Sequence, residues 1–449
     1  MNCLQAGFAR IDVTPMLGIP IVGYYQERFA EGVLDPLEIN ALALACGEKR
    51  AVLLSIDACY VADIHDAVLR NGIAQATGLP LDAIYLCSTH THTGPQIHSQ
   101  SDNPLVAEYF QMLKWKMVDA AKYALADLKP ARLGWGIGNA PNIAFVRRFR
   151  MKDGSVRTNP GVNNPDILHP IGDIDERVTV LRFDRENADT IVFAHFGNHP
   201  DVVGGSKISA DWPGLMRGTV EKVLDNTKCI FFNGAQGDIN HVNVHPTGGY
   251  LNDMFMDFDD VARGYKHAQY MGRVMAAGVM QAYDKVKYVD IESLRFLKRT
   301  IQVPSNRCDP SELPEARRIQ DLHLAGRDAE LPYKGMMLTT KLAAAKRKIE
   351  LENGPDYFEM NLIGLALDSI ALVGVPGEPF MGVGKALKET EGWELVIPTC
   401  LTNGARGYFP TMDAYEEGGY EANASRFKAG VAELIVREGQ ALLTQLKEA

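Results

Sequence analysis

Five apolar, strand-like segments of this chain are each followed directly by a polar loop. The segments and their loops are 83–87 with 88–95, 190–195 with 197–201, 228–232 with 233–241, 369–375 with 376–379, and 395–401 with 402–408. In open α/β sheets, ligands bind outside the carboxyl ends of the strands, so polar residues collected there are better site candidates than scattered ones. The pattern predicts an α/β chain that builds one site from distant segments.

The first loop, Ser-Thr-His-Thr-His-Thr-Gly-Pro over 88–95, contains His90 and His92. Successive strand residues point to opposite faces, so strand geometry here would turn both histidines the same way, toward one metal ion or substrate. A histidine pair with this spacing is structural as often as it is functional. The four other polar loops therefore carry much of the argument for a site.

Segments with helical spacing separate these strands, at 61–75, 105–128, 215–224, 267–283 and 424–446. The alternation predicts an α/β fold with mixed β-sheets flanked by helices and an active site at the carboxyl ends of the strands. The stretch 311–353 is rich in Lys, Arg, Glu, Leu and Ala and has hardly any β-branched residues, which predicts a helical insertion. Composition never shifts enough to place a boundary, so we expect a single domain over 1–449.

Composition also limits the kinds of molecule that this chain is expected to bind. The net charge of −10 and the lack of a basic stripe interleaved with aromatic residues argue against nucleic acid. No run approaches the ~20 apolar residues of a membrane span, so membrane insertion is not expected. The amino terminus has no basic start followed by an apolar stretch, so the default location is cytoplasmic. We expect a small-molecule substrate, and a homo-oligomer is compatible with this size.

The seven cysteines are an odd number and have no Cys-x-x-Cys spacing. This argues against both a disulfide framework and a cysteine-rich zinc site. Cys46, Cys59 and Cys229 lie in apolar surroundings and are expected to be small buried hydrophobic residues. The Gly-Val-Gly-Lys run over 382–385 lacks the full spacing of a phosphate-binding loop, so no nucleotide cofactor is expected.

Several motifs, in this order, resemble the amino-terminal catalytic domain of the neutral or alkaline, non-lysosomal ceramidases. They are Gly-Phe-Ala-Arg-Ile-Asp-Val-Thr-Pro over 7–15, Thr-His-Thr-His-Thr-Gly-Pro over 89–95, His199-Pro200, the run 233–238, Pro376-Gly377-Glu378, and Tyr408 with Tyr420. The resemblance implies one zinc ion held by two histidines, a glutamate and a tyrosine, and hydrolysis of an N-acyl bond. The matching positions are His90, His199, Glu378 and Tyr408.

The same resemblance assigns further residues near the metal. His92 and Tyr420 match positions that lie beside the metal or face the substrate, and an arginine that faces the substrate matches Arg147 or its neighbour Arg148. The family carries a serine two residues after the Gly-Asp of the strand-end motif, and here that position is Asn240. An amide cannot become an alkoxide, so covalent serine chemistry is not carried over.

The chain also ends soon after Tyr420 and its helix, so the immunoglobulin-like carboxyl-terminal domain of the family is expected to be absent. Long-chain ceramide is not the expected substrate. We expect a zinc-dependent hydrolase that cleaves an amide or ester bond of a small polar molecule, such as an acylated sugar or a lactone, through zinc-activated water. His92 would be the general acid or base, Arg147 or Tyr420 would stabilise the oxyanion, and Asn240 would donate a hydrogen bond.

Two other functions fit the same residues. Zinc acting as a Lewis acid would suit a carbohydrate isomerase or lyase in which His92 moves a proton. Loss of the serine would also suit a non-catalytic, metabolite-binding paralogue.

Each site residue also has a structural interpretation. His199 before Pro200 would close a turn, Glu378 would interact with the amino terminus of a helix at 380–388, and Tyr408 would pack in its glycine-rich loop. Asp211 is expected to cap a helix, and Asp57 is either a partner of a histidine or a buried hydrogen-bonding group. A rival cluster, Asp238 with His241 and His245, is expected to line the site, because the residues around it disfavour a helix.

Overall fold

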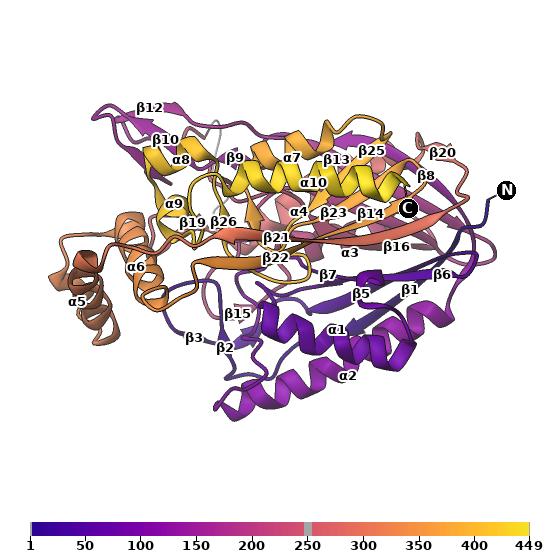
Figure 1. The fold of residues 1–449 in the computed structure, drawn as a ribbon, viewed down its shortest axis with the longest axis horizontal. Helices are drawn as coiled ribbons and strands as arrows, with labels where there is room; N and C mark the ends of the chain where they lie inside the picture. Colours follow the sequence, from indigo (N-terminus) through magenta and orange to yellow (C-terminus); the bar gives the residue numbers. More distant parts are fainter. Residues whose placement is uncertain (1, 247–253, 449) are drawn as a thin grey trace.

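The computed structural model of the chain describes residues 2–246 and 254–448, and it contains two β-sheets packed face to face (Figure 1). The large mixed sheet has the order β16-β14-β13-β8-β1-β5-β6-β7, with β20 beside β8, and the small sheet has the order β21-β22-β23-β25. The strands are β1 Gln5–Asp12, β5 Glu38–Cys46, β6 Lys49–Ile56, β7 Ile84–Ser88, β8 Lys129–Asn139, β13 Arg177–Arg185, β14 Thr190–Phe196, β16 Thr227–Asn233, β20 Lys287–Val289, β21 Leu294–Pro304, β22 Tyr357–Leu367, β23 Ile370–Gly374 and β25 Leu395–Thr399.

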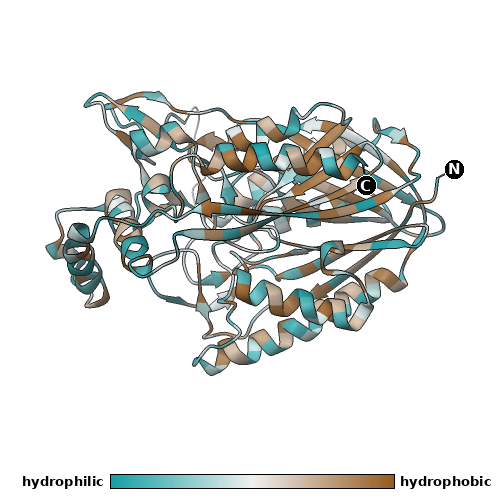
Figure 2. Ribbon diagram, viewed as in Figure 1, coloured by the Kyte–Doolittle hydropathy of each residue, from teal (hydrophilic) through white to brown (hydrophobic). Residues whose placement is uncertain are grey.

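Helices cover the outer face of each sheet. The helices on the large sheet are α1 Asp63–Thr77, α2 Pro104–Ala126, α3 Asp211–Val223 and α4 Tyr265–Tyr283, and those on the small sheet are α7 Met381–Lys388 and α10 Val431–Glu448. A buried apolar cluster, which includes Leu42, Phe193 and Leu372, fills the space between the two sheets. In Figure 2 the strands between the helical layers carry long hydrophobic stretches. The fold is therefore a four-layer α/β/β/α arrangement, and the predicted mixed α/β fold is confirmed.

Short strands and helices make up the loops at one end of the sheets. They are β2 Pro20–Ile21, β3 Arg28–Phe29, β4 Gly32–Val33, β9 Phe145–Val146, β10 Arg148–Met151, β11 Val156–Thr158, β12 Ile167–Pro170, β15 Lys207–Ile208, β17 Ile239–Asn240, β18 Phe255–Met256, β19 Ala262–Arg263, β24 Glu378–Pro379, β26 Tyr408–Phe409, α8 Met412–Glu417 and α9 Tyr420–Ala424.

All five strands predicted before polar loops form, as β7, β14, β16, β23 and β25. They belong to the parallel pairs β6/β7, β14/β16 and β23/β25. Parallel strands buried on both faces read as continuous apolar runs, which explains why these segments were recognisable. Because the strands of a parallel pair end at the same edge, the loops that follow them are brought together.

The large sheet consists of two halves that are weakly joined. β1 pairs with β8 only through Gln5↔Pro130 and Ala6↔Lys129. At the far edges the halves meet again, because Ser55 Oγ on β6 donates to Phe231 O on β16 at 2.6 Å. The loops after β7 and β16 thereby lie together, although these strands stand at opposite ends of the sheet order.

The predicted helices form with shifted ends. Residue 424 begins no long helix, because Gly430 has a φ of 97°, and α10 starts at Val431. The predicted insertion 311–353 contains α5 Leu313–Leu324 and α6 Gly335–Glu350, which form a hairpin at the left of Figure 1. The predicted cap Asp211 is instead the first residue of α3, after Ala210, and its carboxylate accepts from the Trp212, Val202 and Val203 amides.

One prediction about cysteine is wrong. Cys46 is buried as expected, but it forms a disulfide with Cys3, whereas Cys59, Cys87, Cys229, Cys308 and Cys400 are free. β1 and β5 pair antiparallel from Gln5↔Ala45, which brings the ends of these strands within reach of a disulfide. No helix in the described part of the chain has the length and apolar character to cross a membrane.

Candidate active site

Three ligand-type side chains converge at the carboxyl ends of the strands. His90 Nε2 lies 3.3 Å from Glu378 Oε2, and His199 Nε2 lies 3.1 Å from the same oxygen. His90 follows β7, His199 follows β14 and Glu378 follows β23. All three residues are buried, and their ligand atoms lie within 4.8 Å of one another. We refer to His90, His199 and Glu378 as the metal-type cluster.

Main-chain carbonyl groups fix the orientation of both histidines. His90 Nδ1 lies 2.6 Å from Cys59 O, and His199 Nδ1 lies 2.9 Å from Gln236 O and 2.8 Å from Ile239 O. A carbonyl oxygen only accepts hydrogen bonds, so Nδ1 carries the hydrogen in each ring. Nε2 of each ring then faces Glu378, which is the arrangement typical of metal-ligating histidines, and Nε2 of His90 also lies 3.3 Å from Nε2 of His92.

Two atoms of the metal-type cluster lack a hydrogen-bond partner. His199 Nε2 and Glu378 Oε2 are buried and neither makes a hydrogen bond. Leaving such groups unsatisfied costs about 1–3 kcal/mol each, and more for a charged group. A tetrahedral zinc ion with bonds of ~2.0–2.1 Å places neighbouring ligand atoms roughly 3.3 Å apart, close to the spacings seen here. The residues present could therefore hold a metal ion of this size.

Electrostatics within the metal-type cluster follow from the same contacts. Burial opposes ionisation of Glu378, but the facing His90 and His199 rings hold the pKa of its carboxyl well below the usual range. Burial likewise opposes protonation of His90, and Glu378 outweighs it, so the pKa of His90 lies well above its usual value. Burial lowers the pKa of His199, with a smaller contribution from Arg147. The cluster thus favours a positive charge opposite Glu378, which is a proton on His90 when no metal ion is bound.

Tyr408 lies directly beside Glu378. β24 and β26 pair in parallel, with Glu378 opposite Tyr408, and residues opposite each other in a ladder share a face. The Tyr408 ring stacks on the His199 ring, with 6.4 Å between centroids. Burial raises the pKa of Tyr408 well above its usual value. Tyr408 is therefore adjacent to the metal-type cluster, and its role as a ligand stays a prediction.

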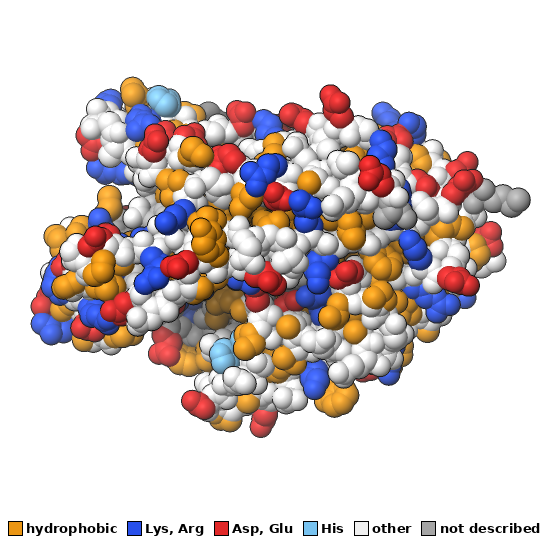
Figure 3. All heavy atoms as spheres, in the orientation of Figure 1, with side chains coloured by type: hydrophobic (Ala, Val, Ile, Leu, Met, Phe, Trp, Pro, Cys, Tyr) orange, Lys and Arg blue, Asp and Glu red, His pale blue; other side chains and the backbone are white. Residues whose placement is uncertain are grey.

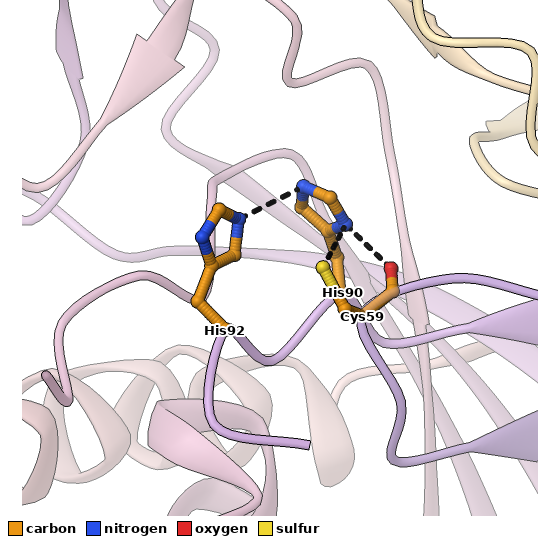
Figure 4. Close-up of side chains that lie close together, drawn as sticks. All are labelled: Cys59, His90 and His92. Carbon is orange, nitrogen blue, oxygen red and sulfur yellow. Dashed lines mark hydrogen bonds between the residues drawn. The ribbon is translucent and has the colours of Figure 1, made fainter. Parts of the chain in front are cut away.

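The two histidines of the first loop meet for a different reason from the one expected. β7 ends at Ser88, and His90 has a φ of 80°, in the left-handed region, so strand alternation does not orient these rings. The turn nevertheless brings His92 Nε2 to 3.3 Å from His90 Nε2 (Figure 4). His92 lies outside the metal-type cluster, and burial holds its pKa well below the usual range.

Figure 4 also shows Cys59, whose thiol completes a second possible metal group. Cys59 Sγ lies 3.9 Å from His90 Nδ1, and Cys59, His90 and His92 are all buried. This group shares His90 with the metal-type cluster. It is less suited to a metal, because His90 Nδ1 already donates to Cys59 O.

The adjacent residues Arg147 and Arg148 point to different surroundings. Arg147 Nε lies 2.7 Å from Glu421 Oε1, and its guanidinium carbon lies 5.3 Å from the centroid of the Tyr408 ring. Arg148 instead pairs with Glu417 at 3.0 Å. Of the two arginines that the sequence could not separate, Arg147 is the one that faces the candidate site.

Tyr420 and Asn240 border the site at a greater distance. The Tyr420 ring lies 5.5 Å from the Tyr408 ring, and 5.9 Å from the Arg147 guanidinium carbon. Asn240 Nδ2 donates to Asn159 Oδ1 at 2.9 Å, and Asn240 Oδ1 accepts from the Val242 amide at 3.0 Å. Asn240 therefore supports the loop that contains Asn159. The second hydrogen of its amide makes no hydrogen bond to a described residue.

The residues of the rival cluster do not come together. Asp238 accepts from the Met381 amide at the start of α7, His241 Nε2 bonds to Ala262 O at 2.8 Å, and His245 is exposed. Burial raises the pKa of Asp238 to about 6. The polar punctuation of 246–260 in the sequence predicts a surface loop able to cover a site, but this loop includes 247–253, which lie outside the described residues.

Asp57 makes hydrogen bonds, as one of its two interpretations predicts. Arg217 Nη1 and Nη2 donate to its two oxygens at 3.0 and 2.6 Å, and Glu38 N donates at 3.0 Å. Thr89 Oγ1, one residue before His90, also donates to Asp57 at 3.2 Å. Asp57 thus anchors the loop that carries His90.

Sequence reasoning missed Asp201 and Glu421. Asp201 Oδ1 lies 3.5 Å from His92 Nδ1 and accepts from the Tyr24 hydroxyl at 2.5 Å, and Arg263 pairs with Asp201 at 2.7 Å. Arg263 outweighs burial and holds the pKa of Asp201 well below the usual range. The signal that could have identified both residues is their place in the sequence. Asp201 lies two residues after His199, and Glu421 directly follows Tyr420.

The sequence matches no family model and no curated protein. The fold does match solved structures. The crystal structure of neutral ceramidase from Pseudomonas aeruginosa matches with a TM-score of 0.74 at 17% sequence identity, covering 100% of this chain and 75% of that chain. A structure of ceramidase complexed with C2 matches with a TM-score of 0.70 at 16% identity, covering 99% and 76%. The chain therefore has a ceramidase-like fold, which confirms the resemblance at the level of fold.

Proposed function

We propose that this chain is a zinc-dependent hydrolase that cleaves an amide or ester bond of a small polar molecule, with water as the nucleophile. One observation carries the proposal. The buried His199 Nε2 and Glu378 Oε2 lie 3.1 Å apart without hydrogen bonds, and His90 Nε2 lies 3.3 Å from the same oxygen. Within the ceramidase-like fold, these three residues and Tyr408 would hold the ion. When bound there, zinc would polarise the scissile carbonyl and make water a nucleophile near neutral pH.

His92 is the residue placed to move protons. Its Nε2 faces the metal-type cluster, and its Nδ1 faces the Asp201 carboxylate at 3.5 Å. Asp201, held by Tyr24 and Arg263, orients the ring and favours the imidazolium that forms. His92 therefore accepts a proton from the attacking water and returns it to the leaving nitrogen or oxygen.

Arg147 and Tyr420 are the candidates for binding the charge that develops on the carbonyl oxygen. Arg147 is charged despite burial, because Glu421 raises the pKa of its guanidinium above the usual value. Pre-oriented donors of this kind stabilise an oxyanion without reorganisation during the reaction. Asn240 cannot be a nucleophile, so no covalent acyl intermediate is needed.

Metal analysis combined with an acyl-substrate panel tests the proposal. We expect about one zinc per chain by plasma mass spectrometry, lost in a His199→Ala, Glu378→Ala variant and kept in His241→Ala. His241 is the matched control, because it is a buried histidine outside the metal-type cluster. The zinc-loaded protein should release a free acid from acylated amines, esters or lactones.

Three outcomes would contradict the proposal. Zinc retained in the double variant would discard the ligand set. Exchange of substrate protons with deuterated water without acid release would favour an isomerase or lyase, and ligand-dependent stabilisation without turnover would favour a metabolite-binding protein.

The cytoplasmic location stays a prediction, and the Cys3–Cys46 disulfide opposes it. Disulfides persist in oxidising compartments and are rare in the cytosol. Alkylation of thiols in intact cells, followed by mass spectrometry, decides between the cytoplasm and an oxidising compartment. A free Cys3 and Cys46 would support the cytoplasm, whereas a fully oxidised pair would place the protein in an oxidising compartment.

A further inference from the structure

A cleft of about 270 Å³ lies between β11, α6 and α9. In Figure 3 the surface is indented between the lobe that carries β10–β12, at the upper left, and the α5–α6 hairpin below it. The cleft has the volume of roughly nine water molecules in the liquid, enough for a short polar group of a substrate.

The floor of the cleft is built from buried residues that also support the candidate active site. Thr158 Oγ1 donates to Glu421 Oε2 at 2.9 Å, and Glu421 Oε1 pairs with Arg147. Asn159 N donates to Arg147 O at 2.8 Å. Gly419, which lines the cleft, directly precedes Tyr420. The cleft thus adjoins Arg147 and Tyr420, the residues expected to face the substrate.

One side-chain donor on this floor opens into the cleft and has no hydrogen-bond partner among the described residues. Asn159 is 7% exposed and lines the cleft, and its Oδ1 accepts from Asn240. Its Nδ2 donates no hydrogen bond to any described residue. Asn159 also has a φ of 45°, a left-handed conformation that its contacts with Asn240 and Arg147 hold in place. An acceptor in the cleft would satisfy this amide.

Three of the four charged residues that line the cleft are cationic, in a chain whose net charge is −10. Arg157 comes from β11, Lys334 is the residue just before α6, and Lys341 lies in the second turn of α6. Within the described residues Lys334 has no ion-pair partner, and Arg157 pairs only with Asp153, across a solvent-exposed contact that contributes little. The acidic lining residue, Asp260, lies against Gly335 at the start of α6, where the helix dipole favours a negative charge.

We propose that this cleft binds an anionic group of the substrate, a carboxylate or a phosphate, while the scissile bond lies at the metal-type cluster. The proposal rests on the proposed hydrolase function and specifies its substrate class. Lys334, Lys341 and Arg157 neutralise the charge, and Asn159 Nδ2 donates a hydrogen bond to it.

Two matched esters test this substrate class. They are para-nitrophenyl hydrogen glutarate, which carries a free carboxylate, and para-nitrophenyl pentanoate, which has an acyl chain of the same length without charge. Water cleaves the ester C–O bond in each case and releases the acid and nitrophenol. The measured quantity is the ratio of kcat/KM for the anionic ester to that for the neutral ester.

We expect the wild-type ratio to exceed one and to fall about tenfold or more in a Lys334→Glu, Lys341→Glu double variant, mainly through KM. Asn159→Asp, which keeps the acceptor for Asn240 and adds a negative charge, should lower the ratio in the same direction. Lys346→Glu is the matched control, because Lys346 is an exposed lysine of α6 outside the cleft, and its ratio should stay within about twofold of the wild type.

The outcomes separate this proposal from the hydrolase function. A ratio that is unchanged in the double variant while both esters are hydrolysed would overturn the cleft and leave the hydrolase intact. If neither ester is hydrolysed, calorimetric titration with glutarate decides. Binding that is lost in the double variant supports the cleft and not the hydrolase, and no binding by the wild type overturns the cleft.

Discussion

Two buried groups of charged residues contact the same loop at neighbouring positions, one through Thr89 and the other through His90, and they differ in how their charges are satisfied. In the first, which we call the Asp57 group, Arg217 donates to both oxygens of Asp57 and also pairs with Glu38 at 3.3 Å. In the metal-type cluster, Glu378 Oε2 faces two imidazole nitrogens and accepts no hydrogen bond. The Asp57 group contains a permanent counter-charge in Arg217, whereas the counter-charge of Glu378 is either a proton on His90 or an added cation.

The difference between the two groups lies in how their charges are balanced. Burial alone does not distinguish the two groups, because Asp57 and Arg217 are as buried as Glu378. Burial opposes the charge on Arg217, but Asp57 and then Glu38 raise the pKa of its guanidinium above the usual value, so it stays charged. Thr89 joins the two groups, since it bonds to Asp57 and precedes His90. The Asp57 group thus holds the scaffold on which the metal-type cluster is mounted.

The largest effect is expected from a substitution that breaks the metal-type cluster. Glu378→Gln removes the charge that faces both histidines, so bound zinc should be lost and kcat/KM should fall about a thousandfold or more. Metal content and steady-state kinetics measure both effects. A variant that keeps stoichiometric zinc and more than about a tenth of the activity would remove Glu378 from the ligand set.

The second prediction breaks the Asp57 group. Arg217→Met leaves the Asp57 carboxylate buried without its counter-charge, which should lower the free energy of unfolding by about 3–5 kcal/mol. Urea denaturation measures this loss, and Arg437→Met, at an exposed pair with Glu438, should change it by less than about 1 kcal/mol. If the single variant does not fold, Arg217→Met combined with Asp57→Leu should recover part of the stability, because no unpaired charge remains. A stable Arg217→Met protein would contradict this account.

Zinc itself should distinguish the two groups. For chelator-washed protein, zinc at about 100 times its Kd should raise the free energy of unfolding by about 2.7 kcal/mol. His199→Ala should abolish this increase, and Asp57→Asn should lower the stability but keep the increase. Thermal and urea unfolding with and without zinc provide the measurement. An equal zinc effect in His199→Ala would place the ion elsewhere.

The smallest effect on kcat/KM is expected from substitutions at the two adjacent arginines, Arg147 and Arg148. Arg147→Lys should lower kcat/KM by about 10- to 100-fold, because the lysine cannot reproduce the planar contact with Glu421 and the donor facing Tyr408. Arg148→Lys disturbs only the ion pair with Glu417, so its kcat/KM should stay within about twofold of the wild type. Equal losses in both variants would mean that Arg147 acts through stability alone.

Much of the fold was predictable because its signals are local. The buried parallel strands read as apolar runs, and the polar residues after them marked the loops that form the site, including His199 and Glu378. Asp211 illustrates the limit of local signals. Its residue type and position suggested a cap, but its carboxylate also accepts from Val202 and Val203, on the neighbouring loop.

The contacts that complete the site were not predictable in the same way. Asp201 lies beside His92, whose main-chain N–H donates to Pro200 O, and Tyr24 and Arg263 reach Asp201 from distant segments. The disulfide of Cys46 depends on the pairing of β1 with β5. Each of these contacts joins residues that no short sequence window contains.

The sequence by itself determined the five strands that precede polar loops, most of the long helices, the chemistry available at those strand ends, and the absence of a serine where Asn240 stands. These features depend on hydrophobic periodicity and side-chain type, which are properties of neighbouring residues. Only the tertiary structure decided that a left-handed His90 faces Glu378, that Tyr408 pairs beside Glu378, and that Arg147 rather than Arg148 turns to the site. The physical reason is that these orientations result from the closing of the two half-sheets and from the β24–β26 ladder, whose partners lie far apart along the chain.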